Sequence, residues 1–228
     1  MILGLLISGT LILAAYLYWR YVWFFRNPDR LAPAGENIVS PADGTVVYVK
    51  GIAPDQDVIT IKQGVQARVE DIVREDLALP KILVGIFMSP FSVHYNRVPL
   101  AGRVEFVHHH PPLFKNRCMA SMHWRTLLRR PPFYTNSLHI LSNERTVTRL
   151  WGKFKATALP YYVVQIAGKS VRGIDSYVRI GQHLDKGVTF GMIRIGSQVD
   201  LVVPRITGMR VLVQPGDKVR AGETILIN

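Results

Sequence analysis

The sequence predicts a mainly β protein: an antiparallel β sandwich or barrel preceded by one N-terminal transmembrane helix. Short runs of alternating apolar residues recur from residue 44 onward and are separated by Pro, Gly and Asn, a pattern typical of antiparallel strands. No regular alternation of strands with long helical patterns accompanies them, which disfavours a βαβ fold. With 228 residues, of which 48% are hydrophobic, the chain is long enough for an anchor and one globular domain.

The first segment, residues 1–19, contains no charged side chain and is long enough to cross a hydrocarbon core of about 30 Å. Aromatic residues gather at its end, as at a membrane interface; they are Tyr16, Tyr18, Trp19, Tyr21 and Trp23. A cleaved signal peptide would have a basic beginning and a small-residue cleavage site, and neither is evident. We therefore predict an uncleaved anchor over residues 1–24 and a β-rich domain over residues 25–228.

Charge predicts the orientation of that anchor. Arg20, Arg26 and Arg30 follow the apolar segment and no basic residue precedes it, which predicts that the β-rich domain lies on the cytoplasmic side of the cell (inner) membrane. The net charge of +12 is dispersed and comes with no nucleic-acid-binding motif, so we expect no nucleic acid partner. The anionic leaflet of the membrane is the simpler partner, because it attracts each nearby basic residue by about 1 kcal/mol.

The strands are expected where apolar residues alternate most regularly. These runs are residues 44–49, 58–61, 81–88, 102–107, 138–141, 146–150, 161–166, 188–195, 199–203 and 210–213. Residues 67–77 favour a short helix. Residues 122–134 mix Trp and Leu with Arg, which suits either a segment lying on a membrane surface or a solvated loop packed on the domain.

The C-terminal strands, over residues 213–227, have two glycine turns flanking a short strand, as in lipoyl-like β modules. Lys218 lies in PGDKV, which is not the setting of a carrier lysine, so we interpret it as turn surface. We found no internal repeat.

A Gly-Ser bond stands out in RIGSQVDLVVP, residues 194–204. Alternating apolar residues flank Gly196 and Ser197, which predicts two strands meeting at a tight turn. The pattern is not the G-x-S-x-G elbow of serine hydrolases. A serine in a strained turn can attack the carbonyl of the residue before it, and a glycine leaves that carbonyl sterically open.

Four further motifs accompany this bond. SPADGTVVYV places Asp43 in a turn before a strand, and IFMSPFSVHYNRVPLAG places His94 in a loop bounded by prolines. Together with FFRNPDR, which precedes them, and VVQIAG and RIGSQVDLVVP, which follow, these motifs resemble the phosphatidylserine decarboxylases, most closely the short bacterial and archaeal type. The resemblance covers most of residues 24–216, with a less familiar stretch at residues 117–137.

The resemblance implies an Asp-His-Ser arrangement of Asp43, His94 and Ser197. A neutral histidine is the base best matched to the Ser197 hydroxyl near neutral pH, and a carboxylate can orient its imidazole. The implied outcome is autocatalytic cleavage between Gly196 and Ser197, with Ser197 converted to a covalent pyruvoyl group. The resulting β chain, residues 1–196, and α chain, residues 197–228, would stay together as a heterodimer, and further homo-oligomerisation is left open.

The pyruvoyl cofactor would then act as the electron sink for loss of carbon dioxide. By resemblance the substrate is phosphatidylserine in the membrane and the product phosphatidylethanolamine, a step of phospholipid biosynthesis.

One position departs from the longer members of the family, which carry H-x-x-H-x-P in this loop. Here the loop reads HYNRVP, so His94 matches the first histidine and Arg97 stands at the second. In those members the second histidine is the one expected to assist self-cleavage and the first is linked to decarboxylation. His94 therefore serves self-cleavage, decarboxylation or both, and Arg97 is a candidate for binding a carboxylate or phosphate of the substrate.

We expect no metal site. His108, His109 and His110 would point to alternate faces of a strand and cannot all bind one ion without distortion, and Cys118 is the sole cysteine. Asp200 is interpreted as structural. Two alternative functions are a non-enzymatic, membrane-anchored lipoyl-like adaptor and an anchored serine hydrolase, the latter disfavoured by the missing elbow.

Overall fold

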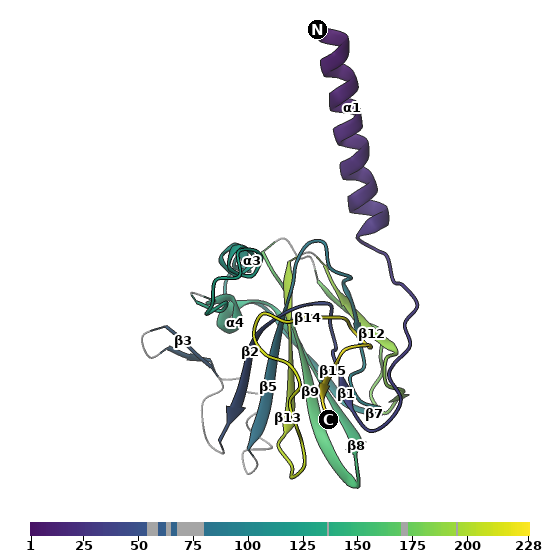
Figure 1. The fold of residues 1–228 in the computed structure, drawn as a ribbon, viewed down its shortest axis with the longest axis vertical. Coiled ribbons are helices and arrows are strands. Elements are labelled where there is room, and N and C mark those ends of the chain that lie inside the picture. Colours follow the sequence, from purple (N-terminus) through teal and green to yellow (C-terminus); the bar gives the residue numbers. More distant parts are fainter. Residues whose placement is uncertain (54–58, 63–64, 68–79, 136, 170–172, 195) are drawn as a thin grey trace.

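The computed structural model describes residues 1–53, 59–62, 65–67, 80–135, 137–169, 173–194 and 196–228. A single helix, α1 (Ile2–Tyr18), projects from a β domain (Figure 1) and continues into a π-helical segment, η1 (Trp19–Trp23). Together they form a 22-residue apolar helix with no buried residue in its most hydrophobic window, about 33 Å long at 1.5 Å per residue. The predicted apolar N-terminal helix is confirmed, and it is consistent with membrane association.

An eight-stranded antiparallel sheet forms the body of the domain, with the order β11-β7-β8-β9-β13-β5-β2-β14. It curls into a half-barrel, which confirms the mainly β, antiparallel fold class. Its strands are β2 (Gly44–Ile52), β5 (Lys81–Met88), β7 (Gly102–His110), β8 (Arg145–Phe154), β9 (Thr157–Ile166), β11 (His183–Leu184), β13 (Ser197–Pro204) and β14 (Lys218–Val219).

The strand β13 lies at the centre of this sheet and is buried along its whole length. It pairs with β5 from Ser197 opposite Met88 to Pro204 opposite Lys81, and with β9 on its other side. Because side chains alternate along a strand, Ser197 and Val199 face one core while Gln198 and Asp200 face the other.

The first core lies between the sheet and short strands that cover it. Val84, Ile86, Val199 and Leu201 are among its buried residues. The covering strands are the pair β1 (Ile38–Val39) and β15 (Ile225–Ile227), and the trio β6 (Tyr95–Arg97), β10 (Ile174–Ser176) and β12 (Thr189–Ile193). The C-terminal segment, with glycine turns at Gly216 and Gly222 on either side of β14, follows the predicted lipoyl-like pattern.

The second core lies on the opposite face, beneath the helices α3 (Ala120–Leu127) and α4 (His139–Ser142). Met122 from α3 packs there with Phe87 and Tyr162. The Tyr48 ring lies across Gly85, where an added Cβ would come within 2.3 Å of the ring. Only glycine at this point of β5 allows Tyr48 to reach across the sheet.

Two predicted strands are absent from the structure, and a predicted helix lies almost wholly outside the described residues. Residues 138–141 were expected to form a strand, but the chain forms α4 there. An apolar run of this length cannot by itself distinguish strand from helix, and hydrogen bonds such as Ile140 N–H to the Ser137 carbonyl close a helical turn. Residues 210–213 form no strand: an isolated bridge joins Val211 to Ile227.

The helix expected at residues 67–77 lies outside the described residues except for Ala67. Ala67 ends β4 (Val65–Ala67), which pairs with β3 (Ile59–Lys62). The strand expected at residues 58–61 corresponds to β3, with Val58 outside the described residues.

Candidate active site

Ser197 is the first residue of β13 and has no exposed surface. Its hydroxyl contacts the Met88 thioether, with 3.5 Å between Oγ and Sδ. Gly196, directly before it, has φ of +60°, a left-handed conformation that glycine adopts without steric cost. The Gly196-Ser197 peptide bond therefore lies at a turn that leads into a central strand, as predicted. The strand before the turn, β12, belongs to a different sheet.

Two buried amides lie near Ser197. Gln165 is opposite Val199 in the sheet and so shares the face of Ser197. Its Nε2 donates to Asn96 Oδ1 at 2.8 Å, and Asn96 in turn contacts Met88. The Gln165 Oε1 atom is buried and has no hydrogen-bond partner among the described residues. Sequence reasoning missed both amides; for Gln165 the signal was a polar residue at the end of an otherwise apolar run in β9.

His94 lies in the loop between β5 and β6 and is fully buried. Its backbone carbonyl accepts a hydrogen bond from Ile193 N–H at 3.2 Å, and its ring packs on the Phe24 ring, with 4.2 Å between centroids. Burial lowers the pKa of His94 to about 4, while the nearby Ser92 backbone raises it, Arg26 lowers it and Asp43 raises it. Because this pKa is far below 7, the ring is a neutral imidazole at pH 7. Neither ring nitrogen makes a hydrogen bond of normal geometry within the described part of the chain.

Asp43 joins three parts of the chain. Its carboxylate accepts two hydrogen bonds from the Arg30 guanidinium, at 2.5 and 2.9 Å, and one from the Ala221 N–H at 2.8 Å. The side chains of this ion pair are largely buried, at 6% exposed for Arg30 and 15% for Asp43. The structure thus brings Asp43 close enough to influence the pKa of His94 without a hydrogen bond between them, and it does not link Asp43, His94 and Ser197 as a hydrogen-bonded relay.

Arg97 occupies the position of the second histidine and holds the segment that follows the anchor. Its terminal nitrogens donate to Asn27 Oδ1, the Pro28 carbonyl and the Gly187 carbonyl, at 2.8 to 2.9 Å. The guanidinium is thereby engaged with protein oxygens and only 8% of the residue is exposed. Together with Phe24 and Arg30, this explains why FFRNPDR belongs to the site: these residues pack against its loops.

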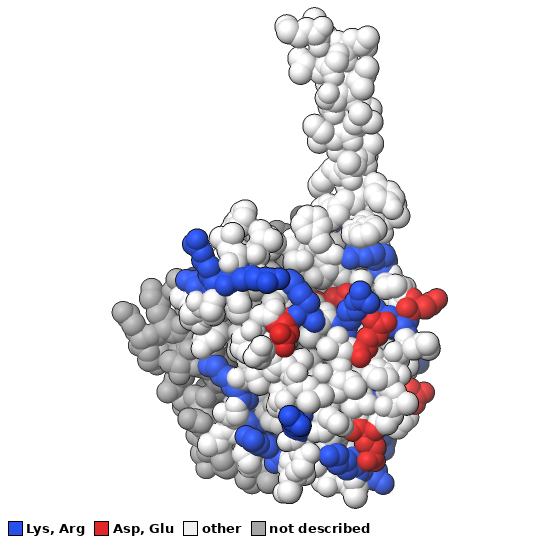
Figure 2. Space-filling view, viewed as in Figure 1, with Lys and Arg blue, Asp and Glu red and all other residues white. Residues whose placement is uncertain are grey.

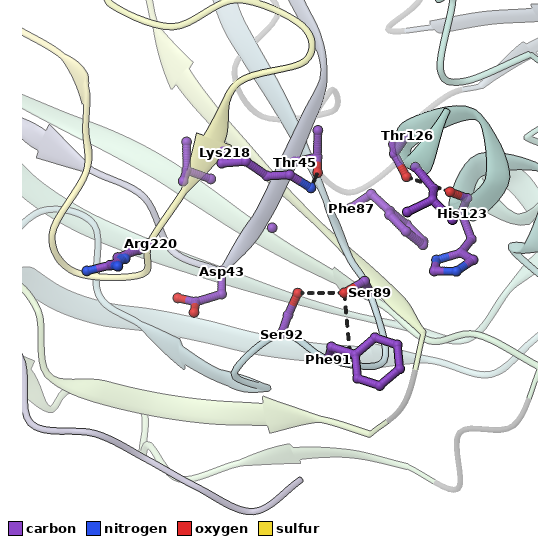
Figure 3. Close-up of a pocket in the computed structure, with 13 residues that line it drawn as sticks. Asp43, Thr45, Phe87, Ser89, Phe91, Ser92, His123, Thr126, Lys218 and Arg220 are labelled. Carbon is purple, nitrogen blue, oxygen red and sulfur yellow. Dashed lines mark hydrogen bonds between the residues drawn. The ribbon is translucent and has the colours of Figure 1, made fainter. Parts of the chain in front are cut away.

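A cleft of about 370 Å³ opens beside the site (Figure 3). Its walls come from the start of β2, the end of β5 with the loop after it, α3 and β14. Lys218, which we interpreted as turn surface, is exposed on β14 and its Nζ donates to Thr45 Oγ1 at 2.6 Å on the cleft wall. The cleft adjoins the site through β5, because Phe87 and Ser89 line the cleft and Met88 between them contacts Ser197.

The opposite face of β13 carries a buried polar network. Asp200 accepts hydrogen bonds from the Tyr48 hydroxyl at 2.8 Å and Gln198 Nε2 at 2.7 Å, and Gln198 Oε1 lies 3.1 Å from His139 Nε2. Burial raises the pKa of Asp200 to about 6 and lowers that of His139 to about 4. Asp200 therefore ties β13 to β2, which agrees with its interpretation as structural.

The histidine run lies on β7. His109 Nδ1 is 3.1 Å from Thr146 Oγ1, and the rings of His108 and His110 are neighbours on one face. Within the described ranges, no three His, Cys, Asp or Glu side chains are grouped as metal ligands would be.

Comparison with known proteins places this fold and site in one family. The family model for phosphatidylserine decarboxylase matches residues 17–227. The phosphatidylserine decarboxylase proenzyme of Beijerinckia indica is 38% identical over 96% of this chain and 77% of its own length. That of Carboxydothermus hydrogenoformans is 34% identical over 99% and 87%. A candidate archaetidylserine decarboxylase proenzyme of Methanopyrus kandleri is 37% identical over 99% and 86%.

These matches run through the anchor-proximal segment, the His94 loop and the Gly196-Ser197 bond alike, and they set aside the adaptor and hydrolase alternatives. The chain belongs to the phosphatidylserine decarboxylase family.

Proposed function

We propose that this protein is a proenzyme that cleaves itself between Gly196 and Ser197 and then decarboxylates phosphatidylserine to phosphatidylethanolamine. The observation that carries the proposal is the left-handed Gly196 directly before a fully buried Ser197 at the start of the central strand. A Cβ added at Gly196 would meet no atom within 4 Å, so no other group packs against its α-carbon on that side.

Cleavage requires only groups of this chain and water. Ser197 Oγ attacks the Gly196 carbonyl carbon, the carbon–nitrogen bond breaks, and the peptide becomes an ester with a free amine on residue 197. Loss of the residue 197 α-proton then expels the Gly196 carboxylate and leaves dehydroalanine, which water converts to a pyruvoyl group with release of ammonia. His94 is proposed as the base, because its neutral imidazole can accept the hydroxyl proton.

The two fragments are expected to remain one molecule. The α chain, residues 197–228, would contain β13, β14 and β15, and each of these pairs with a strand of the β chain. Hydrogen bonds on both sides of β13 and its complete burial hold the α chain in place without the covalent bond.

The residues around position 197 suit a pyruvoyl group there. That group supplies an electron sink for the electrons released with carbon dioxide. We propose the unpartnered Gln165 Oε1 as an acceptor for the substrate amine and the buried His94 as the group that holds a proton during decarboxylation. Because residue 197 is buried, bulk water is excluded both while the substrate amine binds and while the proton is transferred.

The substrate proposal rests on the family and on chemistry shared by the relatives. Phosphatidylserine and archaetidylserine have the same phosphoserine head group, so decarboxylation of either lipid is the same reaction at the serine α-carbon. The apolar α1 and the arginines after it support our proposal that the protein lies at the inner membrane with the β domain in the cytoplasm. A reporter fused after Asn228 should be active only in a cytoplasmic assay, and periplasmic activity would refute this orientation.

Ser197→Ala tests the central step. Purified wild type should show two chains, residues 1–196 and 197–228, by denaturing electrophoresis and intact mass, whereas the variant should remain one 228-residue chain without decarboxylase activity. Ser176→Ala, at an exposed serine of β10, is the matched control and should cleave normally. Release of the residue 197–228 fragment from Ser197→Ala would refute the mechanism.

A further inference from the structure

The outward face of α3 is apolar. Trp124, Leu127 and Leu128 are 58%, 60% and 53% exposed and stand at positions i, i+3 and i+4, which share one side of a helix. The opposite side of α3 is occupied by Met122 and Thr126, which are buried against the second core. A helix that packs one face on a core normally shows a polar face to water, so the apolar outward face needs another partner.

This face lies on the anchor side of the domain. Phe91, in the loop after β5, is 65% exposed and its ring is 6.2 Å from that of Trp19 at the end of α1. Arg26 Nη2 also donates to the Phe91 carbonyl at 2.6 Å. Phe91 and Leu127 line the same cleft, and α3 lies at the end of the domain from which α1 projects (Figure 1).

Positive charge accompanies the apolar residues. Arg125, Arg129 and Arg130 lie within or directly after α3, and Figure 2 shows Lys and Arg side chains near α3 and the foot of α1, with others lower on the domain and acidic side chains between them. A second copy of this chain would bring like charges together at such a face, at a cost in binding free energy. An anionic surface would instead be attracted by about 1 kcal/mol for each basic residue near it.

We propose that Phe91, Trp124, Leu127 and Leu128 form a docking face that inserts into the head-group region of an anionic bilayer. The proposal deepens the proposed function and rests on its assignment of α1 to the membrane. The anchor fixes one point of the domain at the bilayer and the docking face fixes a second, so the cleft between them opens onto the lipid surface. A lipid head group then reaches the cleft while its acyl chains stay in the membrane.

A fluorescent probe on the docking face tests this directly. The exposed Cys118 is replaced by Ser, Leu128→Cys is labelled with an environment-sensitive dye, and the full chain is reconstituted in vesicles of phosphatidylcholine with phosphatidylglycerol. We expect a blue-shifted emission, quenching by nitroxide-labelled lipid and protection from aqueous iodide. The control label is placed at Ala156→Cys, exposed in the turn between β8 and β9 far from α1 in Figure 1, and should be quenched by iodide alone.

The outcomes separate docking from chemistry, because probe depth is measured without any turnover. Iodide quenching of the residue 128 label as strong as at residue 156 would overturn the docking proposal and leave the decarboxylase proposal standing. Protection from both quenchers, with cross-linked dimers, would assign the face to a second copy and also overturn it. Loss of the blue shift in vesicles of phosphatidylcholine alone is expected, since the arginines would then lack their partners.

Discussion

The ring centroids of Phe24 and His94 lie 4.2 Å apart, and this contact joins the end of the apolar N-terminal helix to the candidate active site. Phe24 directly follows η1 and is fully buried in the domain. The lowered pKa of His94 has burial as its largest cause. Phe24 is thus one of the residues whose packing buries the His94 ring and so keeps this candidate base neutral.

Phe24→Ala should therefore change both stability and acidity. Removing a buried phenylalanine costs about 3–5 kcal/mol of unfolding free energy, and water entering the space would raise the pKa of His94 toward its ordinary value. Thermal unfolding in detergent and the pH profile of cleavage measure the two effects. Phe25→Ala, at a neighbour that is 36% exposed, should alter neither by much; equal effects of both variants would argue against a specific contact.

His94→Ala distinguishes the two roles left open for this histidine. If His94 is the base for self-cleavage, the variant should remain one chain, with cleavage slowed by roughly 10² to 10⁴. If it serves decarboxylation alone, the variant should split normally, react with hydroxylamine at residue 197 and release little carbon dioxide. We expect impaired cleavage, because Arg97 replaces the second histidine and is engaged with protein oxygens. Wild-type rates of both steps would remove His94 from the mechanism.

The pH dependence of cleavage follows from the lowered pKa of His94. A base works in its unprotonated form, and with a pKa of about 4 the imidazole stays neutral well below pH 6.5. The cleavage rate of freshly refolded proenzyme should hold steady from pH 7 to about pH 5 and fall as the pH drops through about 4. The same group makes the fold less stable in acid, since the unfolded chain binds its proton at a higher pH. A cleavage midpoint near pH 6.5 would show that His94 is not buried as described.

The Asp43–Arg30 pair offers a test of how the carboxylate acts. Asp43→Asn leaves the buried Arg30 charge without its partner, which costs about 3–5 kcal/mol, and removes the negative charge that raises the pKa of His94. Arg30→Lys weakens the two-point contact but keeps the carboxylate. If Asp43 supports the base, Asp43→Asn should fail to cleave while Arg30→Lys cleaves, as followed by electrophoresis of folded protein. Equal loss in both variants would assign the pair to folding alone.

Much of this fold follows from local pattern. Residues 81–88 coincide with β5 because seven apolar or small residues in a row after Lys81, all buried, leave few alternatives to a central strand. The uncharged N-terminal segment, residues 1–19, likewise coincides with α1 and the first residue of η1. Residues 138–141 were predicted wrongly because Ile140 packs into the second core from a helical turn, and only the tertiary structure decides between the two conformations.

The site was predictable only in part. The sequence alone indicates Gly196 and Ser197, because a glycine and a small polar residue stand at the start of an apolar strand. The Arg30 partner of Asp43 and the Phe24 wall of His94 come from chain segments distant in sequence, and pattern alone does not reveal which loops meet. Gln165 stood in a recognised motif, but its role depends on the register that sets it opposite Val199.

The central position of β13 orders the events of maturation in time. Ser197 lies beside Met88 only after β13 has entered between β5 and β9, so the geometry that brings the hydroxyl into play is a late product of folding. A chain that has not closed its sheet keeps an ordinary serine and stays chemically inert. On the proposed mechanism, self-cleavage would therefore be confined to folded molecules, and the missing peptide bond would mark a molecule whose central sheet has formed.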